Sequence, residues 1–389
     1  MRGSRLGAED LSAGVPLPWD LCDEAGRLLL RRGFFVEHGG PLARMLEAGL
    51  YRRIPADGAK QEPGVEPSLR LRPGGPGKSS SSVFEQIDLI LGELEELLAH
   101  PAPGTFVAQV LQLADDIQSC FALDADASIA TVQLLTSHRY STRRLVHAAI
   151  LMELLLSHRG ESAVQRRLAL AAALTMNLAM LDLQDILNHQ TAQPDPQQKA
   201  LLRQHPERGV ETLRGLGVDD PSWLDMVAQH HETIDGKGYP LGLRAAQIST
   251  LAQILSMVDR YGSMAIGRAY RSPVLPNVVL KQIFMDKQSV APELAALLVS
   301  AVGMYPPGSL VALAGGERAV VLRRSKIASQ PLVAVLKDHR GQRLDRPRRR
   351  LTSEPGQAIS RLLSQDELGF LVDPSELWNE SFEIGSAIH

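Results

Sequence analysis

Apolar residues recur every three or four positions through the middle of the chain. Between residues 84 and 98 they fall on one face of a helix, which predicts a packing surface and a candidate homodimer interface. The same spacing returns at 145–155, 168–183, 248–264 and 292–302. Because helices with one apolar face must bury that face, residues 83–303 are expected to form a helical bundle.

The residues before this helical stretch show another pattern. Residues 1–60 contain glycine and proline turn signals between short apolar runs, which predicts a small N-terminal β-rich module with a closing helix near 41–50. Residues 61–82 are rich in proline, glycine and serine and bury little apolar surface. They are expected to be a flexible linker.

The residues after the bundle again favour strands. Two apolar runs flank Gly315 and Gly316, and a third follows at 331–336, so residues 304–345 predict a short C-terminal β extension. Residues 346–389 are polar and weakly periodic, with a helical hint only at 359–363. We expect this tail to be partly disordered, with its arginine run at 346–350 solvated. The predicted fold class is therefore mainly α, a helical bundle with small β attachments at both ends.

Charge and composition narrow the class of function. Hydrophobic residues make up 44% and charged residues 22% of the 389 residues, an ordinary globular composition. Lys and Arg number 41 against 44 for Asp and Glu, which gives a net charge of 41 − 44 = −3. Such a chain lacks the overall positive field of non-specific nucleic-acid binding, so nucleic acid is an unlikely partner. The arginine run leaves an anionic lipid or nucleic-acid contact as a minor alternative.

Cysteine usage and hydropathy bear on the compartment. Cys22 and Cys120 lie far apart and form no CxxC pair, which argues against a disulfide framework and a cysteine-based zinc site. We found no uninterrupted apolar stretch of the roughly 18 residues that a membrane span needs, and no signal-peptide pattern at the start. The expected location is the cytoplasm.

The densest group of chemically versatile residues is the segment HHETIDGKGYP at 230–240. Its two imidazoles and two carboxylates beside a glycine-rich loop are ligands for divalent metals. Adjacent helical side chains point about 100° apart, so His230 and His231 can reach one site only at a helix end or between helices. The plainer interpretation is two polar residues that cap or pack a helix terminus.

With the residues that follow it, this segment resembles the HD-GYP family of HD phosphohydrolases. The resemblance covers about 136–304 and includes HHETIDGKGYPLGLRAAQI, a helix with Asp259, and the upstream HPERG at 205–209. It implies an HD-type helical bundle and hydrolysis of the bacterial second messenger cyclic di-GMP at two or three iron or manganese ions. It also implies diguanylate-cyclase-type partners that carry GGDEF domains.

Position by position, the resemblance assigns roles to residues of this chain. Its metal-ligand candidates are His205, His230, His231 and Asp259. Its candidates for binding the nucleotide phosphates are Arg268 and Arg271. The residues that match the GYP loop are Asp235, Gly236, Gly238, Tyr239 and Pro240.

The HDxGK element of the family is missing from this chain. The matching helix reads ALTMNLAM, which places Met176 on the histidine, Asn177 on the bridging aspartate and Met180 on the lysine. A further family histidine aligns with Tyr140, across an insertion. A thioether is a poor ligand for iron(II) or manganese, and an amide cannot supply an anionic bridge. Two divalent ions about 4 Å apart repel by roughly 17 kcal/mol at an effective dielectric of 20, so we expect no dinuclear centre.

Two functional hypotheses follow from these departures. The first is a catalytically silent pseudoenzyme in which no residue is catalytic and Met176 and Met180, four residues apart on one helix, fill the old pocket. It would serve as a regulatory scaffold or as a cyclic di-GMP receptor. The alternative is an active phosphodiesterase with a reduced metal site. The four surviving ligand candidates are expected either to hold one iron, manganese or zinc ion as a metal-binding remnant or to form a hydrogen-bonded polar network.

Overall fold

The computed structural model describes four short strands near the N-terminus and then residues 82–267 and 272–378. The strands form an antiparallel sheet in the order β1-β4-β2-β3. They are β1 (Gly3–Leu6), β2 (Leu21–Cys22), β3 (Leu28–Leu30) and β4 (Leu50–Arg53). The helix predicted near 41–50 lies outside the described residues except for Leu50, which begins β4. Residues 61–81 of the expected linker also lie outside them.

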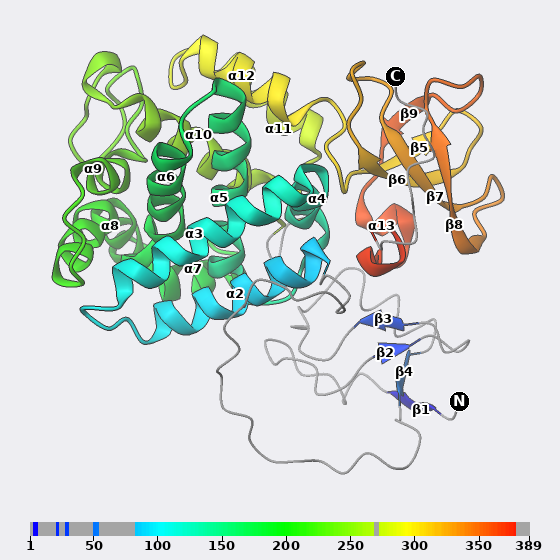
Figure 1. Ribbon diagram of the computed structural model, residues 1–389, viewed down its shortest axis with the longest axis horizontal. Coiled ribbons are helices and arrows are strands. Elements are labelled where there is room, and N and C mark those ends of the chain that lie inside the picture. Colours follow the sequence, from blue (N-terminus) through cyan, green and yellow to red (C-terminus); the bar gives the residue numbers. More distant parts are fainter. Residues whose placement is uncertain are drawn as a thin grey trace, which may run out of the picture.

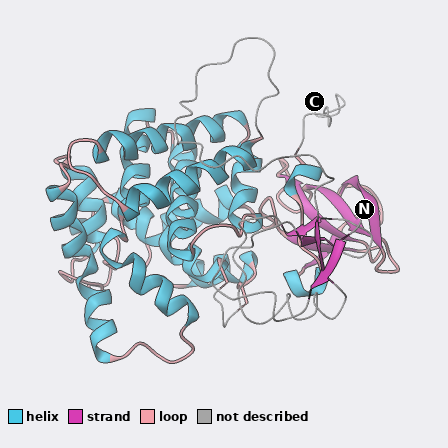
Figure 2. Cartoon of the chain, turned by 90° about the horizontal axis from the view of Figure 1, so that it is seen from below, coloured by secondary structure: helices cyan, strands magenta, loops and turns pink. Residues whose placement is uncertain are grey.

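The central part of the chain is a bundle of α-helices, as the apolar periodicity predicts (Figures 1 and 2). It begins at Ser82, whose hydroxyl and backbone N–H form a capping box with Glu85. Prolines occupy the first turn of α8, α9, α11 and α12, where a missing N–H costs nothing. The helices are α2 (Val83–Ala99), α3 (Phe106–Leu123), α4 (Ala125–Leu134), α5 (Tyr140–Arg159), α6 (Ala163–Thr175), α7 (Leu181–His189), α8 (Pro196–Gly215), α9 (Pro221–Gln229), α10 (Thr250–Ala265), α11 (Pro276–Met285) and α12 (Pro292–Val302).

Helices α5 and α6 form the centre of the bundle. Every residue of α5 from Tyr140 to Leu156 is buried, and the alanine-rich segment 169–174 of α6 is fully enclosed. The run Ala163–His189 is long and apolar enough to pass a composition test for a membrane span. Because 56% of its most apolar window is packed inside the bundle, this run is weak evidence for a membrane segment.

The structure corrects the helix expected at 168–183. Helix α6 ends at Thr175, and Met176 and Asn177 form a turn before the 3₁₀ segment η2 (Leu178–Met180). The Thr175 hydroxyl donates to the carbonyl of Ala171 and accepts from the indole N–H of Trp223, which fixes the helix end against α9. Both Met176 and Met180 are buried, as expected. Because the helix breaks between them, they are not neighbours one turn apart on a single helix.

A second unit follows the bundle, a five-stranded antiparallel sheet in the order β8-β7-β6-β5-β9 (Figure 1). Its alternating apolar side chains form two small cores, one of them covered by α13 and the segment that follows. The elements are β5 (Leu310–Leu313), β6 (Arg318–Arg323), β7 (Leu332–Lys337), β8 (Arg343–Leu351), β9 (Ile359–Leu362), α13 (Gln365–Leu368) and the 3₁₀ segment η4 (Pro374–Glu376).

The partly disordered tail predicted from residue 346 is wrong for residues 346–378. The arginine run belongs to strand β8, and the segment 359–363, expected to be helical, contributes strand β9. Strand β8 lies at the sheet edge, where polar side chains are tolerated on both faces, so its pairing leaves no apolar alternation in the sequence. The β extension therefore continues well beyond its predicted end at residue 345.

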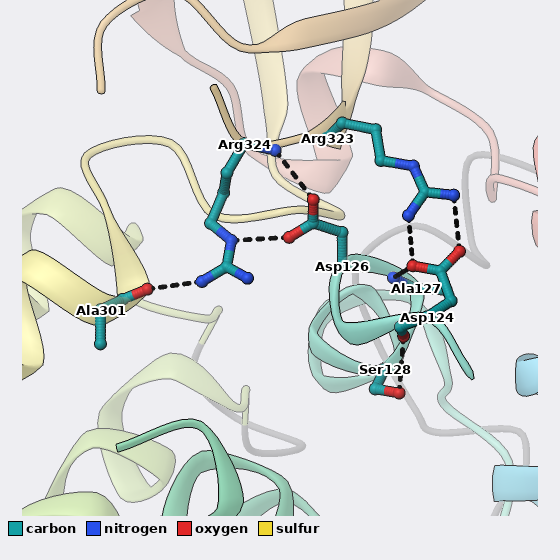
Figure 3. Close-up of polar contacts among 7 residues, drawn as sticks. All are labelled: Asp124, Asp126, Ala127, Ser128, Ala301, Arg323 and Arg324. Atoms are coloured by element: carbon teal, nitrogen blue, oxygen red, sulfur yellow. Dashed lines mark hydrogen bonds and ion pairs between the residues drawn. The ribbon is translucent and has the colours of Figure 1, made fainter. Parts of the chain in front are cut away.

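Two arginines hold this sheet against the bundle (Figure 3). Arg323 forms a two-pronged ion pair with Asp124, and the Nε of Arg324 lies 2.6 Å from Oδ1 of Asp126. The second guanidinium also donates to the carbonyl of Ala301, at the end of α12. Since these acids begin α4, the sheet is attached to two helices of the bundle.

Candidate functional site

Three predicted ligand residues come together where α8 meets the end of α9. His205 lies on α8, His230 is the C-cap of α9, and His231 follows directly. One ring nitrogen from each lies within 4.8 Å of the others. The sequence left a helix end or a site between helices for the adjacent pair, and the two rings converge at the end of α9.

Backbone hydrogen bonds orient two of these rings. The Nδ1 of His205 lies 2.7 Å from the carbonyl of Leu202, and the Nδ1 of His230 lies 2.7 Å from the carbonyl of Val227. Because a carbonyl can only accept, both Nδ1 atoms carry a hydrogen, and the Nε2 atoms of the neutral rings carry lone pairs. These Nε2 atoms face each other at 3.1 Å.

The surroundings keep the three rings neutral. Burial lowers the pKa of His205 to about 3, with the neighbouring His230 adding to the shift. Burial likewise lowers the pKa of His230 and places that of His231 well below its ordinary value. Two neutral rings then direct lone pairs at each other, and the Nε2 of His231 has no hydrogen-bond partner among the described residues. This donor set fits one divalent cation, since imidazole nitrogens are good ligands for zinc and iron(II).

Asp259, the fourth predicted ligand, is engaged by another cation. Its Oδ1 forms a buried ion pair with Nη2 of Arg144, and the same Nη2 donates to the carbonyl of residue 259 at 3.1 Å. Both side chains are less than a tenth exposed. The guanidinium charge also contributes to the lowered pKa of each of the three histidines. A fixed positive charge therefore lies beside the histidine cluster.

The three positions that the sequence aligns with the HDxGK element of the family are buried and uncharged. Met176 and Asn177 are fully enclosed, and Met180 is nearly so. The turn that carries them packs against α8, the helix of His205. Neither amide atom of Asn177 has a hydrogen-bond partner among the described residues. Nothing in this turn supplies an anionic ligand.

The GYP segment folds as a loop around one carboxylate. Glu232 is buried and accepts backbone hydrogen bonds from the three successive residues Leu241, Gly242 and Leu243, at 2.7, 3.1 and 2.9 Å. Gly238 crosses so close to the start of the loop that a Cβ there would lie 2.5 Å from the Cα of residue 232. Glycine is therefore required at this crossing.

The remaining residues of the loop are positioned around Glu232 and the close approach at Gly238. Gly236 adopts a left-handed φ of 76°, beside Asp235, which accepts from the Thr233 hydroxyl and the Lys237 N–H. The peptide bond between residues 239 and 240 is cis. The ring of Tyr239 stacks on His231 with centroids 4.7 Å apart, and the Arg203 guanidinium lies 5.2 Å from the tyrosine centroid. The loop thus forms one wall of the histidine cluster.

Two predicted residues cannot be placed, and one important residue was missed. Arg268 and Arg271 lie outside the described residues. Arg144 was not proposed from the sequence, although a signal was present. Polar residues recur along one face in the first half of α5, at spacings of three, four and seven residues, and are buried in the bundle. They are Tyr140, Arg143, Arg144 and His147.

Comparison with known proteins agrees with this architecture. An HD domain family model matches residues 129–289. A cyclic di-GMP phosphodiesterase of Pseudomonas aeruginosa is 27% identical over 312 residues, which cover 76% of this chain and 75% of that protein. The 3′3′-cGAMP-specific phosphodiesterase 2 of Vibrio cholerae is 28% identical over 117 residues, which cover 30% of this chain and 22% of that protein.

Among solved structures, an HDG"Y"P protein from Bdellovibrio bacteriovorus aligns over 77% of this chain and 99% of that chain. The TM-score is 0.48 and the sequence identity is 16%. The matched residues run from within α4 to just beyond α11 and so include the histidine cluster, Arg144 and the GYP loop. Residues 129–289 therefore match the HD domain model, and the chain is similar to proteins named cyclic di-GMP phosphodiesterases.

Proposed function

We propose that this chain acts in cyclic di-GMP signalling as a catalytically silent HD-GYP-type protein, with the GYP loop retained as a binding surface. The observation that carries this proposal is the buried ion pair between Arg144 and Asp259. It places a permanent cation on the acidic residue that would otherwise bind metal. The relatives named as phosphodiesterases supply the connection to the nucleotide.

The physical argument concerns the charge that the site can hold. A divalent ion about 5 Å from a guanidinium is repelled by roughly 7 kcal/mol at an effective dielectric of 20. Asp259 is already neutralised, while Met176 and Asn177 bring no negative charge to the site. Two divalent ions would then meet neutral imidazoles and one guanidinium. We expect no two-metal centre and therefore none of the hydroxide nucleophile that such a centre generates.

The convergence of His205, His230 and His231 favours a second candidate, an active phosphodiesterase with a reduced metal site. These residues would hold a single divalent ion, which would supply Lewis acidity to a bound phosphate. The chain itself would contribute the buried Arg144 charge and the stacked Tyr239 wall. Under the first proposal the same three residues bind one ion without turnover, or they remain a polar network.

Two measurements on the full chain separate these functions. Calorimetric titration with cyclic di-GMP reports binding, and incubation of the nucleotide with iron(II) or manganese reports cleavage. Our proposal expects no turnover with either metal. Binding without cleavage identifies a receptor, and the absence of both identifies a protein scaffold. Turnover that His230→Ala abolishes would establish the second candidate and end our proposal.

Metal analysis of untagged protein tests the charge argument separately. We expect at most one divalent ion per chain, lost in His231→Ala, which removes one of the three converging nitrogens. A matched control is His158→Ala, because His158 lies exposed at the end of α5, outside the cluster. Two equivalents of metal in the wild-type protein would contradict the account of the site.

A further inference from the structure

Strand β8 has an unusual composition for a sheet edge. Its nine residues, RLDRPRRRL, contain five arginines and a single acid, Asp345. The strand is the last in the order β8-β7-β6-β5-β9, so its outer edge has no partner strand among the described residues. The whole chain carries a net charge of only −3, so this positive charge is a local feature.

The pairing with β7 separates the arginines between the two faces of the sheet. Arg348 lies opposite Val335 and Arg350 opposite Val333, and these valines belong to one core. Because side chains alternate along a strand, Arg348 and Arg350 share one face at a spacing of about 7 Å. The register shifts before Arg348, and Arg346 lies in this irregular part of the strand. Arg349 lies opposite Ala334, which belongs to the other core.

The positive charge of Arg346, Arg348 and Arg350 is not balanced within the described chain. Arg346 and Arg348 are exposed and Arg350 is half-buried. None of the three forms an ion pair with a described carboxylate. On the other face, burial and then the charges of Arg318 and Arg343 lower the pKa of Lys337, while burial and then Arg323 lower the pKa of Arg349. The charges of Arg318, Arg343 and Arg323 thus add to the local concentration of positive charge around β8.

We propose that the outer edge of β8 is a docking surface for an acidic β-strand of a partner protein. A strand added to this edge would satisfy free backbone groups and place its residues directly opposite Arg348 and Arg350, with Arg346 two residues further along β8. Side chains on alternate positions would then form cross-strand pairs of opposite charge. Pro347 lacks an N–H, so such a strand forgoes at most one ladder hydrogen bond there.

The charge and composition of β8 argue against two other occupants of this edge, a second copy of the chain and single-stranded nucleic acid. A second copy of this chain would oppose arginine to arginine on the same edge, which disfavours self-pairing. Single-stranded nucleic acid is bound through aromatic side chains on which bases stack, and β8 contains none. The nearby Phe370 is buried, with the Arg343 guanidinium 4.3 Å from its ring centroid. An acidic strand satisfies both the free edge and the arginine row, whether or not the HD domain is silent.

The test uses a fluorescein-labelled nine-residue peptide in which glutamate alternates with threonine and valine. Binding to the full chain is followed by fluorescence anisotropy at low salt. The comparison peptide has the same composition with all glutamates in one block. We expect the alternating peptide to bind at least tenfold more tightly. Replacing Arg346, Arg348 and Arg350 together with Gln should weaken it at least tenfold.

The matched control changes three exposed cations of α8, Lys199, Arg208 and Arg214, to Gln, so that net charge falls equally while β8 is intact. Circular dichroism verifies that both variants are folded. Equal affinity for the two peptides, or equal weakening by the two variants, overturns the proposal. So does tighter binding of a single-stranded oligonucleotide or of vesicles rich in anionic lipid. A β8 variant that merely self-associates, with no peptide binding by the wild type, shows that the arginines only protect the edge.

Discussion

At the scale of single residues, the GYP loop depends on one carboxylate and one missing side chain. The Glu232 carboxylate accepts hydrogen bonds from three consecutive backbone N–H groups. These strong hydrogen bonds hold the loop against the histidine cluster. Gly238 permits the crossing because the atoms within 3 Å of an added Cβ all belong to the backbone. Backbone cannot rotate away as a side chain can, so the crossing tolerates no substitution.

We predict that Gly238→Ala destabilises the protein by about 1–3 kcal/mol or more, as overpacking of a fixed backbone does. Urea unfolding measures the change in the free energy of unfolding. Gly215→Ala is the control, because Gly215 ends helix α8 and a Cβ there meets nothing within 4 Å. If both variants unfold at the same urea concentration, the close approach at residue 238 is not a constraint.

At the scale of elements, helix α2 is fastened to the start of α5 through the connecting loop. His138 lies between Asp88 and Glu95 of α2, with ring nitrogens 3.3 and 3.5 Å from their carboxylates. Burial alone would lower the pKa of His138, but hydrogen bonds and charge from the two acids outweigh it and raise the pKa to about 9. The residue also adopts a left-handed φ of 70°, which Asn tolerates better than most residues do.

The raised pKa gives this contact a defined pH dependence. Its contribution to stability is complete below about pH 6.5, the ordinary value, declines as the pH rises, and is lost above about pH 9. His138→Asn keeps the backbone conformation and removes the charge. We expect the variant to be less stable than wild type at pH 6, by on the order of 1 kcal/mol for a partly screened contact. At pH 9.5 the difference in unfolding free energy should shrink, and an unchanged difference would refute the assignment.

At the scale of the whole molecule, the C-terminal sheet is attached to the helical bundle. Besides the two arginine–aspartate pairs, Trp378 packs on Phe84 of α2 with ring centroids 5.0 Å apart. Gly308 approaches α4 so closely that a Cβ would lie 2.9 Å from the carbonyl oxygen of Ala130. Apolar contact and ion pairs therefore act together at this boundary.

We predict that replacing Arg323 and Arg324 with Ala loosens the sheet from the bundle. The expected result is faster proteolytic cleavage near residues 303–309, which connect the two units. Arg167→Ala is the control, because it breaks a comparable pair with Asp115, at 2.6 and 2.7 Å, inside the bundle. Cleavage that is no faster in the double variant than in this control would show that apolar contacts alone hold the sheet.

The sequence by itself predicted the helical bundle and limited the adjacent histidines to a helix end or a site between helices. Its resemblance to the HD-GYP family indicated that the HD pair is replaced. These features depend on local spacing and residue type, which can be read directly from the sequence. The roles of Arg268 and Arg271 in binding phosphate stay predictions, because both residues lie outside the described residues.

Only the tertiary structure decided the partner of Asp259, the break after Thr175 and the strand formed by the arginine run. The first two depend on contacts between segments far apart in sequence, α5 with α10 and α6 with α9. The third depends on the pairing of β8 with the preceding strand β7 at the edge of the sheet. A buried arginine and a solvated one look alike in a sequence, because desolvation and ion pairing are properties of the surroundings. The charge state of the candidate site is therefore set by packing.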